Sequence, residues 1–282
     1  MSVPAAGLSE GRRSLVEMTW TLIAILGAVG LVAGFVDALA GGGGLLTIPA
    51  LLLSGLDPVA ALATNKLQSS FGSGSAVIAF ARRGHVDFHQ TRWMVVTTLI
   101  GACLGVAAVS VAPLSLLSAA LPVLLIAMAL YFAFSSRFSP KAGIEDGKAR
   151  MSPGLFTLTM APLIGFYDGL FGPGTGSFFM LAFVALCGYG VIHATANTKL
   201  LNFTSNFASL ILFILAGKIV WVVGLVMGVG QFVGAQVGSY MAVRQGARVI
   251  RPLLVLVCCS VAVKLLLDPA NPLHQAVISL FQ

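Results

Sequence analysis

The chain consists mainly of long apolar runs that charged residues rarely interrupt. Ten apolar elements are expected, and most are long enough for a helix that crosses a bilayer, which needs about 20 residues. The first five are residues 18–40, 45–55, 58–81, 91–111 and 114–134. The second five are 154–171, 177–188, 191–216, 219–243 and 249–267. Since segments such as 121–134 lack the alternation of a transmembrane strand, the pattern predicts an all-α polytopic membrane protein.

The sequence contains the same pattern twice. The stretch 34–39 (GFVDAL) returns as 165–170 (GFYDGL), an offset of 131 residues, and 64–67 (TNKL) returns as 197–200 (NTKL), an offset of 133. A glycine pair four residues apart at Gly101 and Gly105 returns at Gly234 and Gly238. Such spacing allows close helix packing, either within one chain or between subunits. Because each copy has five elements, an odd number, the copies are expected to insert in opposite orientations.

The second element of each copy is short and follows a glycine-rich stretch, at 41–44 in the first copy and 172–176 in the second. A length near half a span is typical of a broken or re-entrant helix. The expected organisation is an N-terminal tail (1–17), a first transmembrane repeat (18–135), a cytoplasmic linker (136–152), a second repeat (153–267) and a C-terminal tail (268–282).

Composition excludes several classes of function. Hydrophobic residues make up 58% of the chain and charged residues 9%, and the net charge of +7 comes from basic residues that fall mostly in loops, as membrane topology requires. No nucleic-acid partner is therefore expected. The four cysteines lie in apolar runs without a paired spacing, so neither a metal site nor a disulfide framework is indicated. No cofactor motif is present, which disfavours an intramembrane enzyme.

An inverted repeat interrupted by glycine-rich breaks indicates a secondary transporter with its site between the copies. Where a helix restarts after a break, its N–H groups favour an anion. Two lysines inside apolar elements, with threonine and asparagine beside them, add positive charge. The candidate substrate-binding residues are Lys66, Lys199, Thr64, Asn65, Asn197, Thr198, Gly42, Gly43, Gly44, Gly174, Thr175, Gly176 and Asn202. At helical spacing beyond the lysines, Gln68, Ser69 and Asn206 can share their face.

A buried ammonium needs a partner, and the candidates are Asp37, Asp168 or a bound anion. Two interpretations stay open at this point. The lysines clamp an anionic substrate, or they form Asp–Lys pairs that only neutralise each other. Asp37, Asp168 and His193 are also candidates for charge partners or for carrying a coupling proton.

The glycine run 41–44 followed by Pro49 and Gly55, the stretch 63–67 (ATNKL) and the basic stretch 82–86 (RRGHV) resemble the sulfite exporter TauE/SafE family of membrane transporters. Residues 165–203 and 234–238 are similar to the second half of that family. The resemblance covers nearly all of 18–267. It is looser in the second copy, where Pro173 and Thr175 interrupt the glycine run.

The resemblance implies export of sulfite or organosulfonates such as sulfoacetate across the inner membrane of bacteria by a multi-pass carrier. The residues alone indicate an anion. The expected partners are a small anionic substrate, the lipid bilayer and a coupling proton or ion, with formation of a homo-oligomer left open. A passive anion channel is the nearest alternative.

Overall fold

The computed structural model describes residues 20–113, 115–121, 123, 124, 127 and 149–242, and over these residues it contains helices and no strand. The predicted all-α fold is therefore confirmed. The expected elements 249–267 and most of 114–134, together with most of the linker, lie outside the described residues. The helices are α1 (Trp20–Ala40), α2 (Gly44–Leu53), α3 (Pro58–Ala81), α4 (Phe88–Val111), α6 (Pro153–Leu158), α7 (Met160–Leu170), α8 (Thr175–Ala185), α9 (Val191–Leu215) and α10 (Trp221–Ala242).

Helix lengths divide the described elements into two kinds. Four helices are long and apolar enough to cross a membrane, namely α1, α4, α9 and α10. The helices α2 and α8 have only 10 and 11 residues, so the short elements expected after the two glycine-rich stretches are confirmed as short helices. The helix α3 has 24 residues but carries a long polar face. That face, which includes Lys66, points into the protein.

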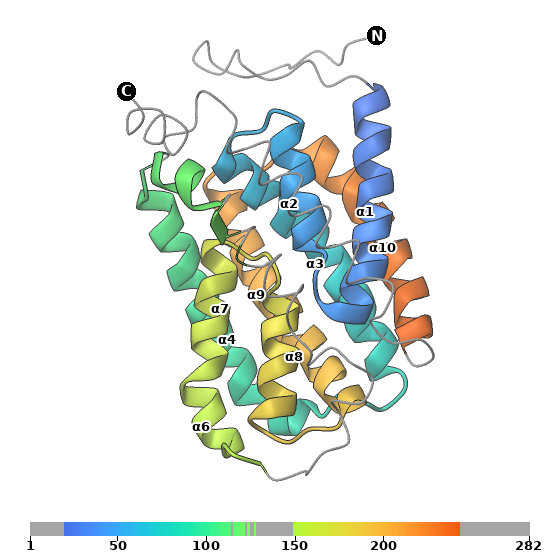
Figure 1. Ribbon diagram of the computed structural model, residues 1–282, viewed down its shortest axis with the longest axis vertical. Coiled ribbons are helices and arrows are strands. Elements are labelled where there is room, and N and C mark those ends of the chain that lie inside the picture. The colour runs from blue at the N-terminus through green and yellow to red at the C-terminus, as the bar shows by residue number, and fades with distance from the viewer. Residues whose placement is uncertain (1–19, 114, 122, 125–126, 128–148, 243–282) are drawn as a thin grey trace.

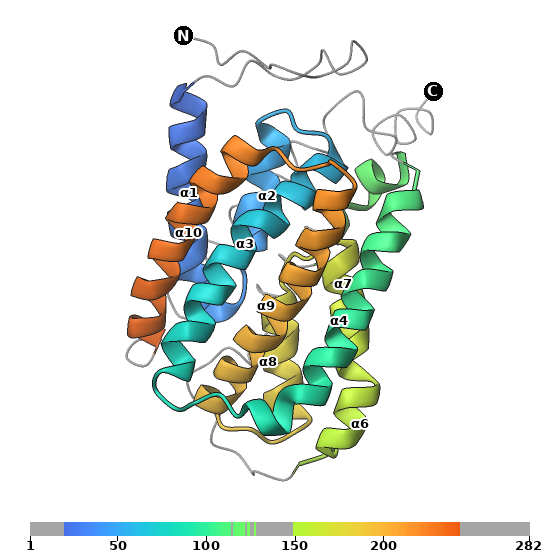
Figure 2. The same ribbon diagram turned by 180° about the vertical axis from the view of Figure 1, so that it is seen from behind.

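The helices form a symmetric order in space. Seen from behind, α3 and α9 lie side by side at the centre, with α10 and α1 beyond α3 and α4 and α7 beyond α9 (Figure 2). In Figure 1, α1 descends from the upper end of the molecule, whereas α6 and α7 rise from the lower end. The short helices α2 and α8 lie in front of the central pair, next to the ends of α1 and α7.

The outer helix pairs are packed through glycines at repeat-related positions. No room exists for a Cβ atom at these glycines, because it would overlap main-chain atoms of the facing helix. On α4, Gly101 faces Pro162 and Gly105 faces Phe166 of α7, and on α10, Gly234 faces Leu31 and Gly238 faces Phe35 of α1. The glycine pairs thus mediate packing within one chain, and each joins the fourth helix of one copy to the first helix of the other.

Two of the differences from the expected helix boundaries have a clear physical cause. The predicted element 154–171 is divided into α6 and α7 at Thr159, because Pro162 has no N–H to donate to the carbonyl of Leu158 one turn earlier. The helix α4 begins at Phe88, three residues before the predicted start. Asp87 caps it, with Oδ1 accepting hydrogen bonds of 3.0 Å from the N–H groups of residues 89 and 90.

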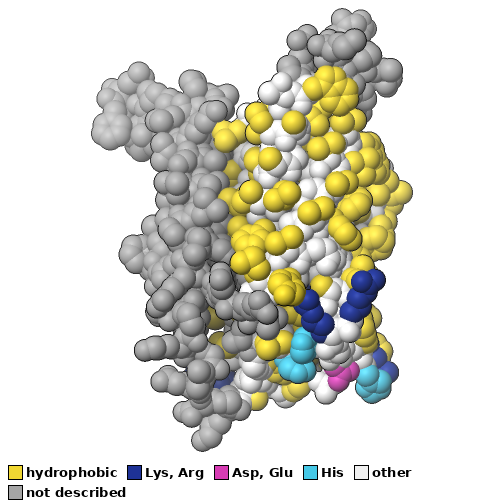
Figure 3. Space-filling view, turned by 90° about the vertical axis from the view of Figure 1, so that its right-hand side faces the viewer, with side chains coloured by type: hydrophobic (Ala, Val, Ile, Leu, Met, Phe, Trp, Pro, Cys, Tyr) yellow, Lys and Arg dark blue, Asp and Glu magenta, His cyan; other side chains and the backbone are white. Residues whose placement is uncertain are grey.

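The surface shows the separation of polar and apolar side chains expected in a bilayer. On the face that carries α1 and α10, hydrophobic side chains cover most of the height of the molecule, and charged and histidine side chains gather at the lower end (Figure 3). The α3–α4 turn lies at this end and contributes exposed Arg82, Arg83, Asp87 and His89. This face therefore has an apolar surface that charged side chains bound at its lower end.

Candidate functional site

The two glycine-rich breaks meet beside a small polar cavity that both copies line. Its volume is about 10 Å³, measured as the space open to the centre of a water-sized sphere. This is room for about one water molecule. Each copy contributes five lining residues, namely Asp37, Gly41, Gly44, Asn65 and Ser69 from the first and Asp168, Gly172, Gly176, Asn202 and Asn206 from the second.

The two breaks are in direct contact beside the cavity. A Cβ atom built on Gly176 would lie 2.6 Å from the Cα of Gly41, so only glycines allow the two main chains to come this close. Gly41 and Gly172 also have φ values of 73° and 92°, in the left-handed region that glycine adopts without strain. Since Gly44 and Gly176 line the cavity, the N-terminal ends of α2 and α8 both reach it.

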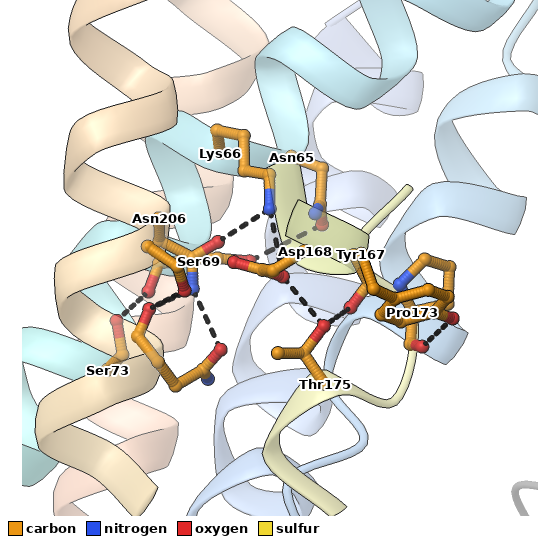
Figure 4. A network of polar contacts seen from close by, with 12 residues as sticks. Asn65, Lys66, Ser69, Ser73, Tyr167, Asp168, Pro173, Thr175 and Asn206 are labelled. Carbon is orange, nitrogen blue, oxygen red and sulfur yellow. Dashed lines mark hydrogen bonds and ion pairs between the residues drawn. The ribbon is translucent and has the colours of Figure 1, made fainter. Parts of the chain in front are cut away.

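Lys66 pairs with an aspartate of the other copy. Its Nζ lies 2.9 Å from Oδ1 of Asp168 and donates a further hydrogen bond of 3.3 Å to Oδ1 of Asn206 (Figure 4). The same Asp168 oxygen accepts a hydrogen bond of 2.8 Å from the hydroxyl of Thr175, which is in the first turn of α8. The two charged side chains are only 1% and 2% exposed, so the ion pair is fully inside the protein.

Lys199 makes the reciprocal pair. Its Nζ lies 3.0 Å from Oδ2 of Asp37 and also donates to the main-chain carbonyl of Asp37. The other carboxylate oxygen, Oδ1, accepts a hydrogen bond of 3.3 Å from the N–H of Gly43, just before α2. Each lysine therefore neutralises the aspartate of the opposite copy, and neither lysine is among the residues that line the cavity.

Amide and hydroxyl groups fill the rest of the cavity wall. Oδ1 of Asn65 accepts hydrogen bonds from the hydroxyl of Thr47 and the amide of Gln68, both 2.7 Å long. On α9, the amide of Asn206 donates to the carbonyl of Asn202 at 2.8 Å. These contacts fix the orientations of the amides, and they tie the first turn of α2 to α3.

The remaining candidates lie further from the cavity. The hydroxyl of Thr64 accepts a hydrogen bond of 3.1 Å from the N–H of Val220, so it faces the start of α10. Asn197 and Thr198 are buried but do not line the cavity, and Oδ1 and Oγ1 of these residues have no hydrogen-bond partner among the described residues. His193 is exposed and lies against His85, with ring centroids 6.3 Å apart, so the structure does not bring it to the site.

One contact beside the site was not expected from the sequence. The hydroxyl of Tyr167 donates a hydrogen bond of 2.6 Å to the carbonyl of Pro173, across the second break (Figure 4). The corresponding residues of the first copy are Val36 and Gly42. The signal was present in the sequence, because both partners depart from the repeat together.

No group of three His, Cys, Asp or Glu side chains that could hold a metal ion occurs among the described residues. The charges that meet at the cavity are two ammonium and two carboxylate groups, all buried and mutually neutralised. The fold and the site define a helical membrane protein with a charge-paired polar cavity to which both halves of the chain contribute.

The chain belongs to the sulfite exporter TauE/SafE family, whose family model matches residues 26–265. It is 51% identical to the probable membrane transporter protein ORF9 of Sinorhizobium sp over 258 residues, which cover 92% of this chain and 97% of that protein. It is 46% identical to the probable membrane transporter protein YfcA of Escherichia coli strain K12 over 259 residues, covering 92% and 95%. A probable membrane transporter protein of Haemophilus influenzae is 44% identical over 247 residues, covering 88% and 95%. No solved structure matches the chain.

Proposed function

We propose that this protein is a secondary transporter that carries a small anion across the bacterial inner membrane by alternating access. The observation that carries the proposal is the cavity between the copies, to which each copy contributes five residues. Relatives of nearly full length from several bacteria are named as probable membrane transporters, which supports the same class. The two copies, 18–135 and 153–267, act as the two halves that move relative to each other.

The chemistry around the cavity favours an anion. Two helix N-termini reach the cavity through Gly44 and Gly176, and each provides N–H groups and the positive end of a helix dipole. Lys66 and Lys199 lie directly behind the aspartates that line it. An anion that replaces a carboxylate as the partner of a lysine keeps the ammonium neutralised. The lysine can therefore pair with aspartate at one stage of the cycle and with the substrate anion at another.

The size of the cavity indicates which stage the structure represents. A space for about one water molecule does not admit sulfite or a sulfonate. In the proposed cycle, this arrangement, in which the two breaks touch, is the closed state. Transport requires that α2 and α8 separate, first toward one side of the membrane and then toward the other.

Sulfite and organosulfonates are the proposed substrates, because the chain belongs to a family described by sulfite export. Ammonium and N–H groups donate hydrogen bonds to the oxygens of such anions. Export is the proposed direction for the same reason. A carrier itself runs in either direction, depending on the gradients that act on it.

Thermal unfolding of the purified protein in detergent tests the proposal. Sulfite or methanesulfonate is expected to raise the unfolding temperature with the logarithm of its concentration, because it binds only the folded state. The increase, measured against each variant's own value without ligand, is expected to disappear in Lys66→Ala, which removes the ammonium that pairs with the anion. It is also expected to disappear in Lys199→Ala, which leaves the carboxylate of Asp37 at the cavity without its cation. The exposed Lys218→Ala serves as the control and is expected to respond like the wild type.

Uptake into proteoliposomes separates a carrier from a channel. A carrier saturates and exchanges labelled for unlabelled anion, whereas a channel does neither. The proposal is wrong if no sulfur oxyanion stabilises the wild type and none is exchanged.

A further inference from the structure

The two cross-copy ion pairs are not equivalent. Both carboxylate oxygens of Asp37 have partners, since Oδ1 accepts from the N–H of Gly43 and Oδ2 from Lys199. In Asp168, Oδ1 accepts both bonds, from Lys66 and from Thr175, and the buried Oδ2 has no partner among the described residues. In the Lys199–Asp37 pair both carboxylate oxygens are therefore hydrogen-bonded, whereas the Lys66–Asp168 pair leaves one carboxylate oxygen without a partner among the described residues.

An ionised carboxylate oxygen that is buried without a hydrogen bond is unfavourable. Two changes remove this cost: a partner can approach the oxygen, or the oxygen can take up a proton and become a donor itself. The Asp168 side chain lines the cavity, so protons and water can reach it when the cavity opens. Asp37 lines the same cavity, but both of its oxygens are already engaged.

We propose that Asp168 carries the coupling proton at Oδ2, and that Lys66–Asp168 is the pair that separates when the anion binds. This inference rests on the proposed function and names its coupling ion. Protonation converts the Asp168 carboxylate to a neutral acid, and the ammonium of Lys66 is released for the incoming anion. Lys199 stays with Asp37, where it is held by the side chain and by the main-chain carbonyl.

Charge balance fixes the stoichiometry. The closed site holds two ammonium and two carboxylate groups, and so has no net charge. An additional uncompensated charge at this depth is strongly disfavoured. When one proton neutralises Asp168 and one monovalent anion binds Lys66, the site again has no net charge. One proton therefore moves with each monovalent anion, in the same direction, and export proceeds when the outward gradient of the anion exceeds the inward gradient of protons.

The groups around Asp168 are consistent with this assignment. Lys66 on α3 is the charged group in contact with it, and Tyr167 precedes it on α7. Across the cavity lies Asp37 of α1, which is paired with Lys199 of α9. The helices α6 and α8 carry no titratable side chain. The other titratable residues on helices that pack against α7 are His89, Arg92 and Cys103 on α4 and His193 on α9.

Transport of methanesulfonate into proteoliposomes tests the inference, because this anion stays ionised throughout the working pH range. For coupling of one proton to one anion, a gradient of one pH unit, acidic outside, supports about tenfold accumulation. Accumulation is expected to be insensitive to a membrane potential set with potassium and valinomycin, since the step moves no net charge. Asp168→Asn is expected to lose the accumulation. The exposed cap variant Asp87→Asn is the matched control and is expected to accumulate like the wild type.

A second measurement needs no variant. In weakly buffered detergent solution, binding of methanesulfonate to the wild type is expected to remove one proton from solution per anion bound, seen with a pH indicator dye. Exchange without accumulation in the wild type, accumulation retained by Asp168→Asn, or binding without proton uptake would each overturn the inference and leave the carrier intact. Absence of exchange for both methanesulfonate and sulfite in the wild type would instead overturn the proposed function, and this inference with it.

Discussion

Gly41 and Gly176 lie in main-chain contact, although one follows the first helix of the first copy and the other is in the first turn of α8 in the second copy. The contact is mutual, since a Cβ atom on either glycine would overlap main-chain atoms of the other. Because the two helix breaks are in contact, a substitution that displaces the main chain of one is expected to displace the main chain of the other.

Gly176→Ala is expected to destabilise the closed state by about 1–3 kcal/mol, the usual cost of overpacking a tight interior. The methyl group would lie 2.6 Å from the Cα of Gly41, and no flexible side chain is there to move aside. Thermal or denaturant unfolding in detergent measures the change. Gly154→Ala is the matched control, because it is also near the start of a helix but has no atom within 4 Å of the new methyl group.

The control is expected to be neutral or to stabilise the protein by up to about 1 kcal/mol, the helix preference of alanine over glycine. Equal stability changes for the two variants would contradict the contact between the breaks.

Gly101→Ala and Gly234→Ala are each expected to cost about 1–3 kcal/mol, because each methyl group would overlap a main-chain carbonyl of the facing helix. Gly101 contacts α7 and Gly234 contacts α1, so the two changes affect separate interfaces. The free energies of unfolding are therefore expected to add in the double variant, to within about 0.5 kcal/mol. A loss of dimer without a loss of monomer stability would show instead that these glycines mediate contacts between subunits.

The sequence predicted the fold more completely than the pairing of its charges. Apolar runs and the glycines that interrupt them are local features of the sequence. They predict the observed bounds of α3 and the short lengths of α2 and α8. The repeat offsets marked the glycines that pack the helices. The break at Thr159 does not show in the apolar pattern, because Pro162, which lacks the N–H, is itself apolar and leaves the run unbroken.

The identity of the lysine partners depends on how the copies are placed in space. Along the sequence, Asp37 and Lys66 lie in one copy, and Asp168 and Lys199 in the other. The structure exchanges these partners between copies, and neither periodicity nor composition contains that information. His193 shows that nearness in sequence is no guide either, because it lies six residues from Lys199 and does not line the cavity.

Removing one member of the Lys199–Asp37 ion pair is expected to lower the stability of the fold far more than removing both. Lys199→Met leaves the carboxylate of Asp37 buried without its cation, at a cost of about 3–5 kcal/mol. Adding Asp37→Asn removes the unpaired charge, and the asparagine oxygen can still accept from the N–H of Gly43. The double variant is therefore expected to be more stable than Lys199→Met alone.

A double-mutant cycle on the free energies of unfolding measures this coupling. Strict additivity of the two single changes would show that the two groups do not interact in the folded protein.

Tyr167→Phe tests the contact that departs from the repeat. Loss of the 2.6 Å hydrogen bond leaves the carbonyl of Pro173 without this donor, at an expected cost of about 0.5–1.5 kcal/mol. Because that carbonyl belongs to the second break, the change is also expected to loosen the entry to α8 and to speed hydrogen exchange of the amides there more than those of α2. Equal acceleration of hydrogen exchange in α2 and α8 would mean that the Tyr167 hydroxyl stabilises the whole bundle and not the second break in particular.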